Sequence, residues 1–185
     1  MVAISELWLP ILVSAVVVFV VSSVIHMFLG YHKNDMGALA NEDATMDALR
    51  ALKLPFGEYI VPKPWTMAQM RSPEYKAKFE RGPVVMLNVI DAKLAMGKNL
   101  VQWFVYLLVI GFCCAYISGR ELPPGAHYLT VFRLVGFSAF MAYALALPQA
   151  AIWYHHSWRA TLITMFDGLV FAALTGGVFG WLWPH

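Results

Sequence analysis

The sequence predicts an all-α membrane protein with four transmembrane helices and a small α(+β) segment between the first two. Four stretches are apolar over about 20 residues or more, the length that crosses ~30 Å of hydrocarbon as a helix. The chain is 60% hydrophobic, and its mean hydropathy of +0.63 is too high for an ordinary soluble domain. We expect one transmembrane helix within residues 1–30, a folded segment at 31–98, and a three-helix part at 99–185 with spans 99–118, 128–153 and 161–183.

Residues 1–30 are expected to form an uncleaved first span. The residues before the apolar stretch include Glu6 and no Lys or Arg, whereas a signal peptide begins with positive charge and has a shorter apolar region. His32 and Lys33 follow the stretch and would hold its end on the inner side.

The segment 31–98 contains ordered start and stop signals. Asn41, followed by two acidic residues, predicts a helix of about three turns that ends before Pro55. Ser72 followed by Pro73 predicts a second helix, which ends at Gly82. Residues 58–61 are predicted to be a short extended run, and residues 84–90 either a strand or a buried apolar run. So small a fold is marginal alone, and we expect it to dock on the spans or on a partner.

The distribution of basic residues predicts the orientation. Ten of the thirteen Lys and Arg lie in 31–98, and Arg159 lies in the turn that shares its side of the membrane. The positive-inside rule therefore places 31–98 in the cytoplasm and both termini outside, as in a bacterial inner-membrane protein. The net charge of +2 gives no reason to expect a nucleic-acid partner.

Small residues recur every fourth position in the last two spans and predict close helix packing. These residues are Gly168, Ala172, Gly176 and Gly180 in the fourth span, and Ser138, Ala142, Ala146 and Ala150 in the third. Pro148 should bend the third span, because it has no N–H to donate.

Tryptophans near the ends of the spans, with Arg133 near the outer end of the third, are expected to be interfacial anchors. The tryptophans are Trp8, Trp103, Trp153, Trp158, Trp181 and Trp183. Arg133 either reaches lipid phosphates or pairs with Glu121 or Glu6.

Asp167 is the most unusual residue, because a carboxylate within a span needs a partner. His26 of the first span is the expected partner, with Ser22 and Ser23 completing an intramembrane polar cluster. Tyr31 and His32, with His155 and His156, should lie on the same half of the membrane.

These features leave three functions open. We favour a non-catalytic accessory or scaffolding subunit that contacts the lipid bilayer and other membrane subunits, since no nucleophile–base pair is visible. Its partner surface would be the Pro62–Trp65 stretch. The alternative is a small redox protein that binds haem or a metal through His26, His155 or His156. The third is a proton-coupled transporter that uses Asp167.

Overall fold

The computed structural model describes residues 1–91, 93 and 96–185, which form two compact units. Unit 1 comprises Met1–Gly37 and Met96–His185, and unit 2 comprises Ala38–Ala95. Residues 31–37, which the sequence grouped with the segment between the spans, therefore belong to the unit that contains the spans.

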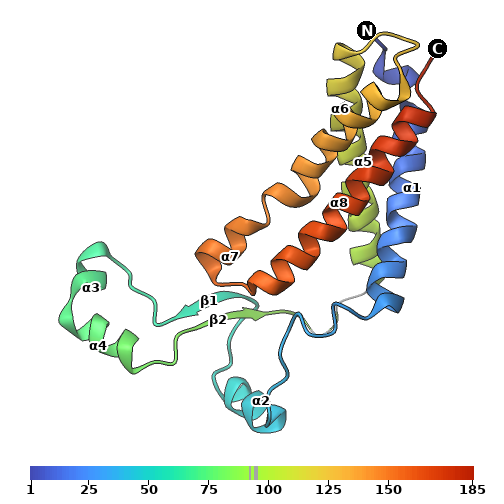
Figure 1. The fold of residues 1–185 in the computed structure, drawn as a ribbon. Helices are drawn as coiled ribbons and strands as arrows, with labels where there is room; N and C mark the ends of the chain where they lie inside the picture. The colour runs from blue at the N-terminus through green and yellow to red at the C-terminus, as the bar shows by residue number, and fades with distance from the viewer. Residues whose placement is uncertain (92, 94–95) are drawn as a thin grey trace. The chain divides into compact units, whose positions relative to one another are not determined.

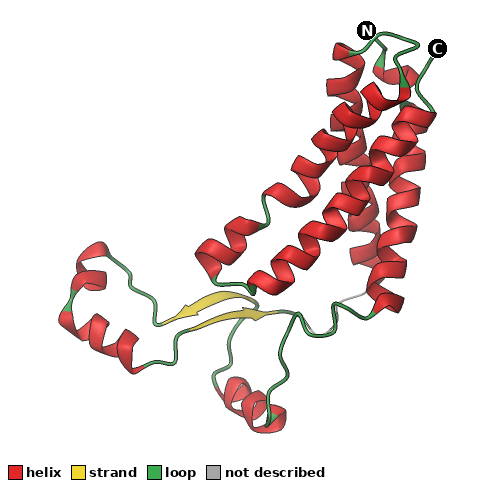
Figure 2. Ribbon diagram, viewed as in Figure 1, coloured by secondary structure: helices red, strands yellow, loops and turns green. Residues whose placement is uncertain are grey.

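Four helices of unit 1 are long and apolar enough to cross a membrane, as the sequence predicted (Figures 1 and 2). By length and composition they fit a multi-pass, integral membrane location. The first span is α1 (Trp8–Val24) with a π-helical turn (Ile25–Leu29), and the second is α5 (Met96–Glu121). The third is α6 (Tyr128–Phe140), a π-helical turn (Met141–Leu145) and α7 (Pro148–Tyr154), and the fourth is α8 (Trp158–Trp181).

The third span is interrupted where the sequence predicted a bend. Two turn residues, Ala146 and Leu147, separate the π-helical turn from α7, whose first residue is Pro148. Proline fits the first position of a helix because it has no N–H to leave unpaired there. The position of Pro148 thus explains why a new helix starts at this point.

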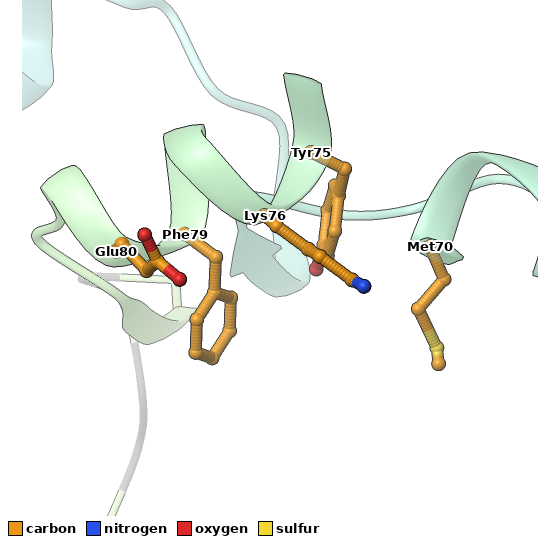
Figure 3. A pocket seen from close by; sticks show the side chains of 5 residues that line it. All are labelled: Met70, Tyr75, Lys76, Phe79 and Glu80. Atoms are coloured by element: carbon orange, nitrogen blue, oxygen red, sulfur yellow. The ribbon is translucent and has the colours of Figure 1, made fainter. Parts of the chain in front are cut away.

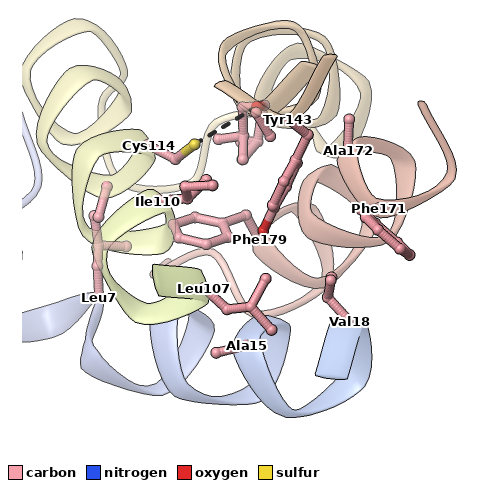
Figure 4. Packing of buried hydrophobic residues seen from close by; sticks show 14 of the residues in the cluster. Leu7, Ala15, Val18, Leu107, Ile110, Cys114, Tyr143, Phe171, Ala172 and Phe179 are labelled. Atoms are coloured by element: carbon pink, nitrogen blue, oxygen red, sulfur yellow. Dashed lines mark hydrogen bonds between the residues drawn. The ribbon is translucent and has the colours of Figure 1, made fainter. Parts of the chain in front are cut away.

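The four spans share one buried core (Figure 4). Helix α1 packs against α5 and α8, and α6 packs against the same two helices. Val18, Leu107, Val135 and Phe179 are fully buried and come from α1, α5, α6 and α8 respectively. In lipid, such interlocking contributes through close contact rather than through expulsion of water.

The glycines of α8 lie against the third span. A Cβ added at Gly176 would lie 2.8 Å from the carbonyl oxygen of Phe132, and one at Gly180 would lie 2.8 Å from the ring of Tyr128. At Gly168 the nearest atom would be Cβ of Ala144, at 3.0 Å. At Gly176 the nearest atom belongs to the backbone, so there only glycine permits this approach without displacement of the backbone.

The partners of these glycines differ from the expected ones. Ala142 and Ala146 are exposed, Ser138 and Ala150 are half-buried, and none of the four is among the atoms nearest to the α8 glycines. Phe132 and Gly136 of α6 lie against Gly176, so Ser138 is already off the contact face before the π-helical turn Met141–Leu145 begins. Within that turn, which has more residues per turn than an α-helix, Tyr143 and Ala144 lie against Gly168.

Both termini are fixed at the end of unit 1 that carries the loop between α5 and α6 (Figure 1). The amide of Val2 donates to the carbonyl of Gly119 at 2.7 Å. The indole of Trp183 donates to the carbonyl of Pro123 at 2.9 Å. The opposite end of the spans is therefore the end at which His26 and Arg159 lie.

Unit 2 contains the two helices and two strands that the sequence predicted. Asn41 and Ser72 accept hydrogen bonds from backbone amides and cap α2 and α4. A further short helix, α3, follows Thr66 and was not expected. The strands pair antiparallel, with Gly57 opposite Val89. The elements are α2 (Glu42–Ala51), β1 (Gly57–Val61), α3 (Met67–Arg71), α4 (Pro73–Arg81) and β2 (Val85–Val89).

Candidate metal centre

Asp167 is the buried centre of a polar network, and its carboxylate is 1% exposed. The Tyr31 hydroxyl donates to Oδ1, and Nε2 of His32 lies 2.8 Å from Oδ2. Burial, together with Asp167, raises the pKa of Tyr31 to about 12, so the hydroxyl keeps its proton as a donor. Asp167 therefore has a partner on each oxygen, as a carboxylate among helices requires.

A reversal of the chain after α1 brings Tyr31 and His32 to α8. The π-helical turn ends at Gly30, whose φ of +64° lies in the left-handed region that glycine adopts without strain. The amide of Lys33 then donates to the carbonyl of Gly30 at 3.2 Å and closes a turn. Because of this turn, residues beyond the span fold back onto the fourth helix.

His32 lies between two carboxylates. Its Nδ1 is 2.6 Å from Oδ2 of Asp35, while its Nε2 faces Asp167. Burial lowers the pKa of His32, but its hydrogen bonds with Asp35 and Asp167 outweigh that effect and raise it above the usual value. The guanidinium of Arg159 lies 3.6 Å from the other oxygen of Asp35. Two cations thus face two carboxylates when His32 is protonated.

His26 presents one free ring nitrogen. Its Nδ1 lies 2.9 Å from the carbonyl oxygen of Ser22, and a carbonyl can only accept, so Nδ1 carries the proton. The lone pair of the neutral ring is then on Nε2. The ring stacks on His32 with centroids 4.5 Å apart and planes 9° from parallel. The edges of both imidazoles are therefore close to Asp167.

His26, His32 and Asp167 each offer one ligand atom, and these atoms all lie within 4.8 Å of one another. Around a tetrahedral ion with bonds of ~2.1 Å, donor atoms lie ~3.4 Å apart, so small movements would close the site. Each residue also has an outer partner: the Ser22 carbonyl for His26, Asp35 for His32, and Tyr31 for Asp167. Such partners orient the ligands of metal sites.

A haem does not fit this pair of histidines. Two axial histidines occupy opposite faces of a macrocycle, whereas His26 and His32 stack directly on each other. His155 and His156, the other predicted haem or metal ligands, are exposed at the end of α7 and do not join the cluster. The donor set therefore fits a single ion.

The two serines of the predicted polar cluster do not contact Asp167. The hydroxyls of Ser22 and Ser23 both donate to the carbonyl of Phe19. Ser22 also accepts from the indole of Trp103 at 3.0 Å. The sequence grouped Tyr31 and His32 with Asp167 but named His26 as the partner of Asp167, and it did not identify Asp35.

The predicted anchors divide into two groups. Trp103 donates a hydrogen bond to Ser22 between the spans, and Trp183 donates one to Pro123 in the loop between α5 and α6, where its side chain is buried. Arg133 is exposed, and the ion pairs within the described ranges do not join it to Glu6 or Glu121. The remaining tryptophans, Trp8, Trp153, Trp158 and Trp181, are exposed.

Comparisons with protein-family models, with curated proteins and with solved structures returned no match to this chain.

Proposed function

We propose that this chain is a membrane metalloprotein that binds one divalent transition-metal ion through His26, His32 and Asp167. These three side chains converge from the end of the first span, the turn that follows it and α8, and this convergence supports the proposal most directly. Two imidazoles and one carboxylate suit zinc, iron(II) or manganese.

The outer partners strengthen the proposal. The Ser22 carbonyl and the Asp35 carboxylate each accept from an Nδ1–H, which leaves Nε2 of both histidines to face the ion. The proton on Nε2 of His32 would leave when the ion binds, and the hydrogen bond to Asp167 would give way to two bonds to the ion.

The number of ligands favours a reactive centre over a structural one. Structural zinc sites are closed by four protein ligands, whereas catalytic sites use three and leave a position for water or substrate. When bound, such an ion supplies Lewis-acid chemistry to whatever occupies that position. This geometry favours a metal centre over the accessory role expected from the sequence. We place the site on the cytoplasmic side, because Lys33 and Arg159 flank it.

The proposal is tested by metal content. The full chain, purified in mild detergent and exposed to zinc, iron(II) or manganese, should retain one ion per chain after dialysis. His32→Ala and Asp167→Asn should abolish retention. A double His155→Ala, His156→Ala variant is the matched control, because those exposed histidines lie outside the cluster. If the chain retains none of the three metals, the network is an ion-pair clamp between α8 and the end of the first span, and the proposal is wrong.

A further inference from the structure

Unit 2 has an exposed apolar hollow that the metal centre does not involve. It measures about 330 Å³ and is lined by Met70 of α3 and by Tyr75, Lys76, Phe79 and Glu80 of α4 (Figure 3). Met70 and Phe79 are 40% and 47% exposed. Figure 3 shows their side chains projecting to the same side of the two helices. Exposed apolar side chains on one side of a helix can enter the boundary between lipid headgroups and acyl chains.

The loop before α3 adds exposed apolar surface to the same unit. Trp65 is 77% exposed, and Nζ of Lys63 lies 4.7 Å from the centre of its ring. The Tyr75 hydroxyl donates to the carbonyl of Pro62 at 3.2 Å and ties this loop to α4. An exposed tryptophan paired with a lysine is typical of side chains at the level of lipid headgroups.

The net positive charge of the segment that carries the hollow favours an anionic partner. Residues 57–90 carry five basic and three acidic side chains. Anionic lipid surfaces attract such basic groups, while the apolar side chains enter the boundary between headgroups and acyl chains. The basic residues are Lys63, Arg71, Lys76, Lys78 and Arg81.

The connections of unit 2 keep it near a membrane. Its chain is continuous with Met1–Gly37 on one side and with α5 from Met96 on the other, and both stretches include a candidate span. We propose that the α3–α4 surface of unit 2, with Trp65 and Lys63, binds anionic phospholipid headgroups. This surface is independent of the proposed metal centre.

A polarity-sensitive fluorophore at the hollow tests the proposal. The full chain would carry Met70→Cys in a Cys113→Ser, Cys114→Ala background and be placed in nanodiscs. The discs would contain phosphatidylcholine alone, or equal parts of phosphatidylcholine and phosphatidylglycerol. The label should emit at shorter wavelength only in the anionic discs. A label on exposed Ala44 of the acidic helix α2 should not respond.

Two opposite charge reversals in the same hollow provide the matched comparison. Lys76→Glu should reduce the spectral shift and Glu80→Lys should enlarge it, since both side chains line the hollow. On the unlabelled chain, hydrogen exchange across Pro73–Arg81 should slow in the anionic discs. Equal emission in both lipids would overturn the proposal. So would a shift that follows the number of chains per disc, since that indicates self-association.

Discussion

Nε2 of His32 lies 2.8 Å from Oδ2 of Asp167, although 135 residues separate them in the chain. This contact joins the turn after the first span to α8. It brings together one potential metal ligand from each of these two segments. The same side chains therefore contribute both to the stability of unit 1 and to the proposed metal centre, and the two contributions can be measured separately.

Asp167→Asn should destabilise the metal-free protein. An amide in place of the carboxylate still accepts from Tyr31, but it removes the buried negative charge that pairs with protonated His32. Hydrogen bonds to charged groups contribute roughly 1.5–3 kcal/mol, so we expect a loss of about this size. Thermal unfolding in detergent measures the loss. Glu121→Gln, at an exposed position of the same unit, should change little, and equal effects of the two variants would contradict this account.

Replacement of the outer partners should weaken metal binding while leaving all three ligands in place. Asp35→Asn and Tyr31→Phe remove the groups that orient His32 and Asp167. Comparable changes in metalloproteins lower affinity by roughly 10–100-fold. Competition with a chromophoric chelator gives the affinity. Unchanged affinity in both variants would mean that these groups do not support a metal.

The effect of pH on stability should have opposite signs without and with metal. The raised pKa of His32 means that its charged form stabilises the metal-free fold fully below about 6.5, the unfolded value, and that this contribution is lost as pH rises through the folded pKa. Metal binding needs Nε2 without its proton, so stabilisation by the ion should grow with rising pH. Melting temperatures with and without zinc, between about pH 6 and pH 8, compare the two trends. Parallel trends would count against metal coordination by His32.

Adjacent glycines of α8 should differ in their tolerance of a methyl group. Gly176→Ala would place Cβ 2.8 Å from the backbone oxygen of Phe132, whereas the nearest atom to a Cβ at Gly177 is the Tyr128 hydroxyl, at 3.6 Å. Overpacking of this kind costs roughly 1–3 kcal/mol. Gly176→Ala should therefore unfold at lower temperature than Gly177→Ala. A similar melting temperature for both would show that the third and fourth spans do not pack through Gly176.

The spans and the capped helices could be predicted because their signals are local in the sequence. The length of the apolar stretches identified the four spans, and the capping side chains of Asn41 and Ser72 identified the starts of α2 and α4. The third-span ladder was wrong because the spacing of small residues does not say which face of a helix meets its neighbour, and Phe132 and Gly136 lie against Gly176 where Ser138 was expected to face α8. The extra residue per turn at Met141–Leu145 then changes which side chains continue that face.

The site was predicted in part. Asp167 was identifiable because a carboxylate in an apolar span is costly, and His26 because it lies on the same half of the membrane. His32 and Asp35 lie beyond the span, and their approach depends on the left-handed turn at Gly30. One sequence pattern could have indicated this approach of His32 and Asp35 to α8. It is a glycine directly after an apolar helix, followed by a histidine and an aspartate three residues apart.

X-ray absorption at the metal edge of the loaded protein tests the central claim most directly. The account predicts scattering from two imidazole rings with additional oxygen ligands, and the loss of one ring in His26→Ala and in His32→Ala. A spectrum with no imidazole scattering, or one that neither substitution changes, would contradict it.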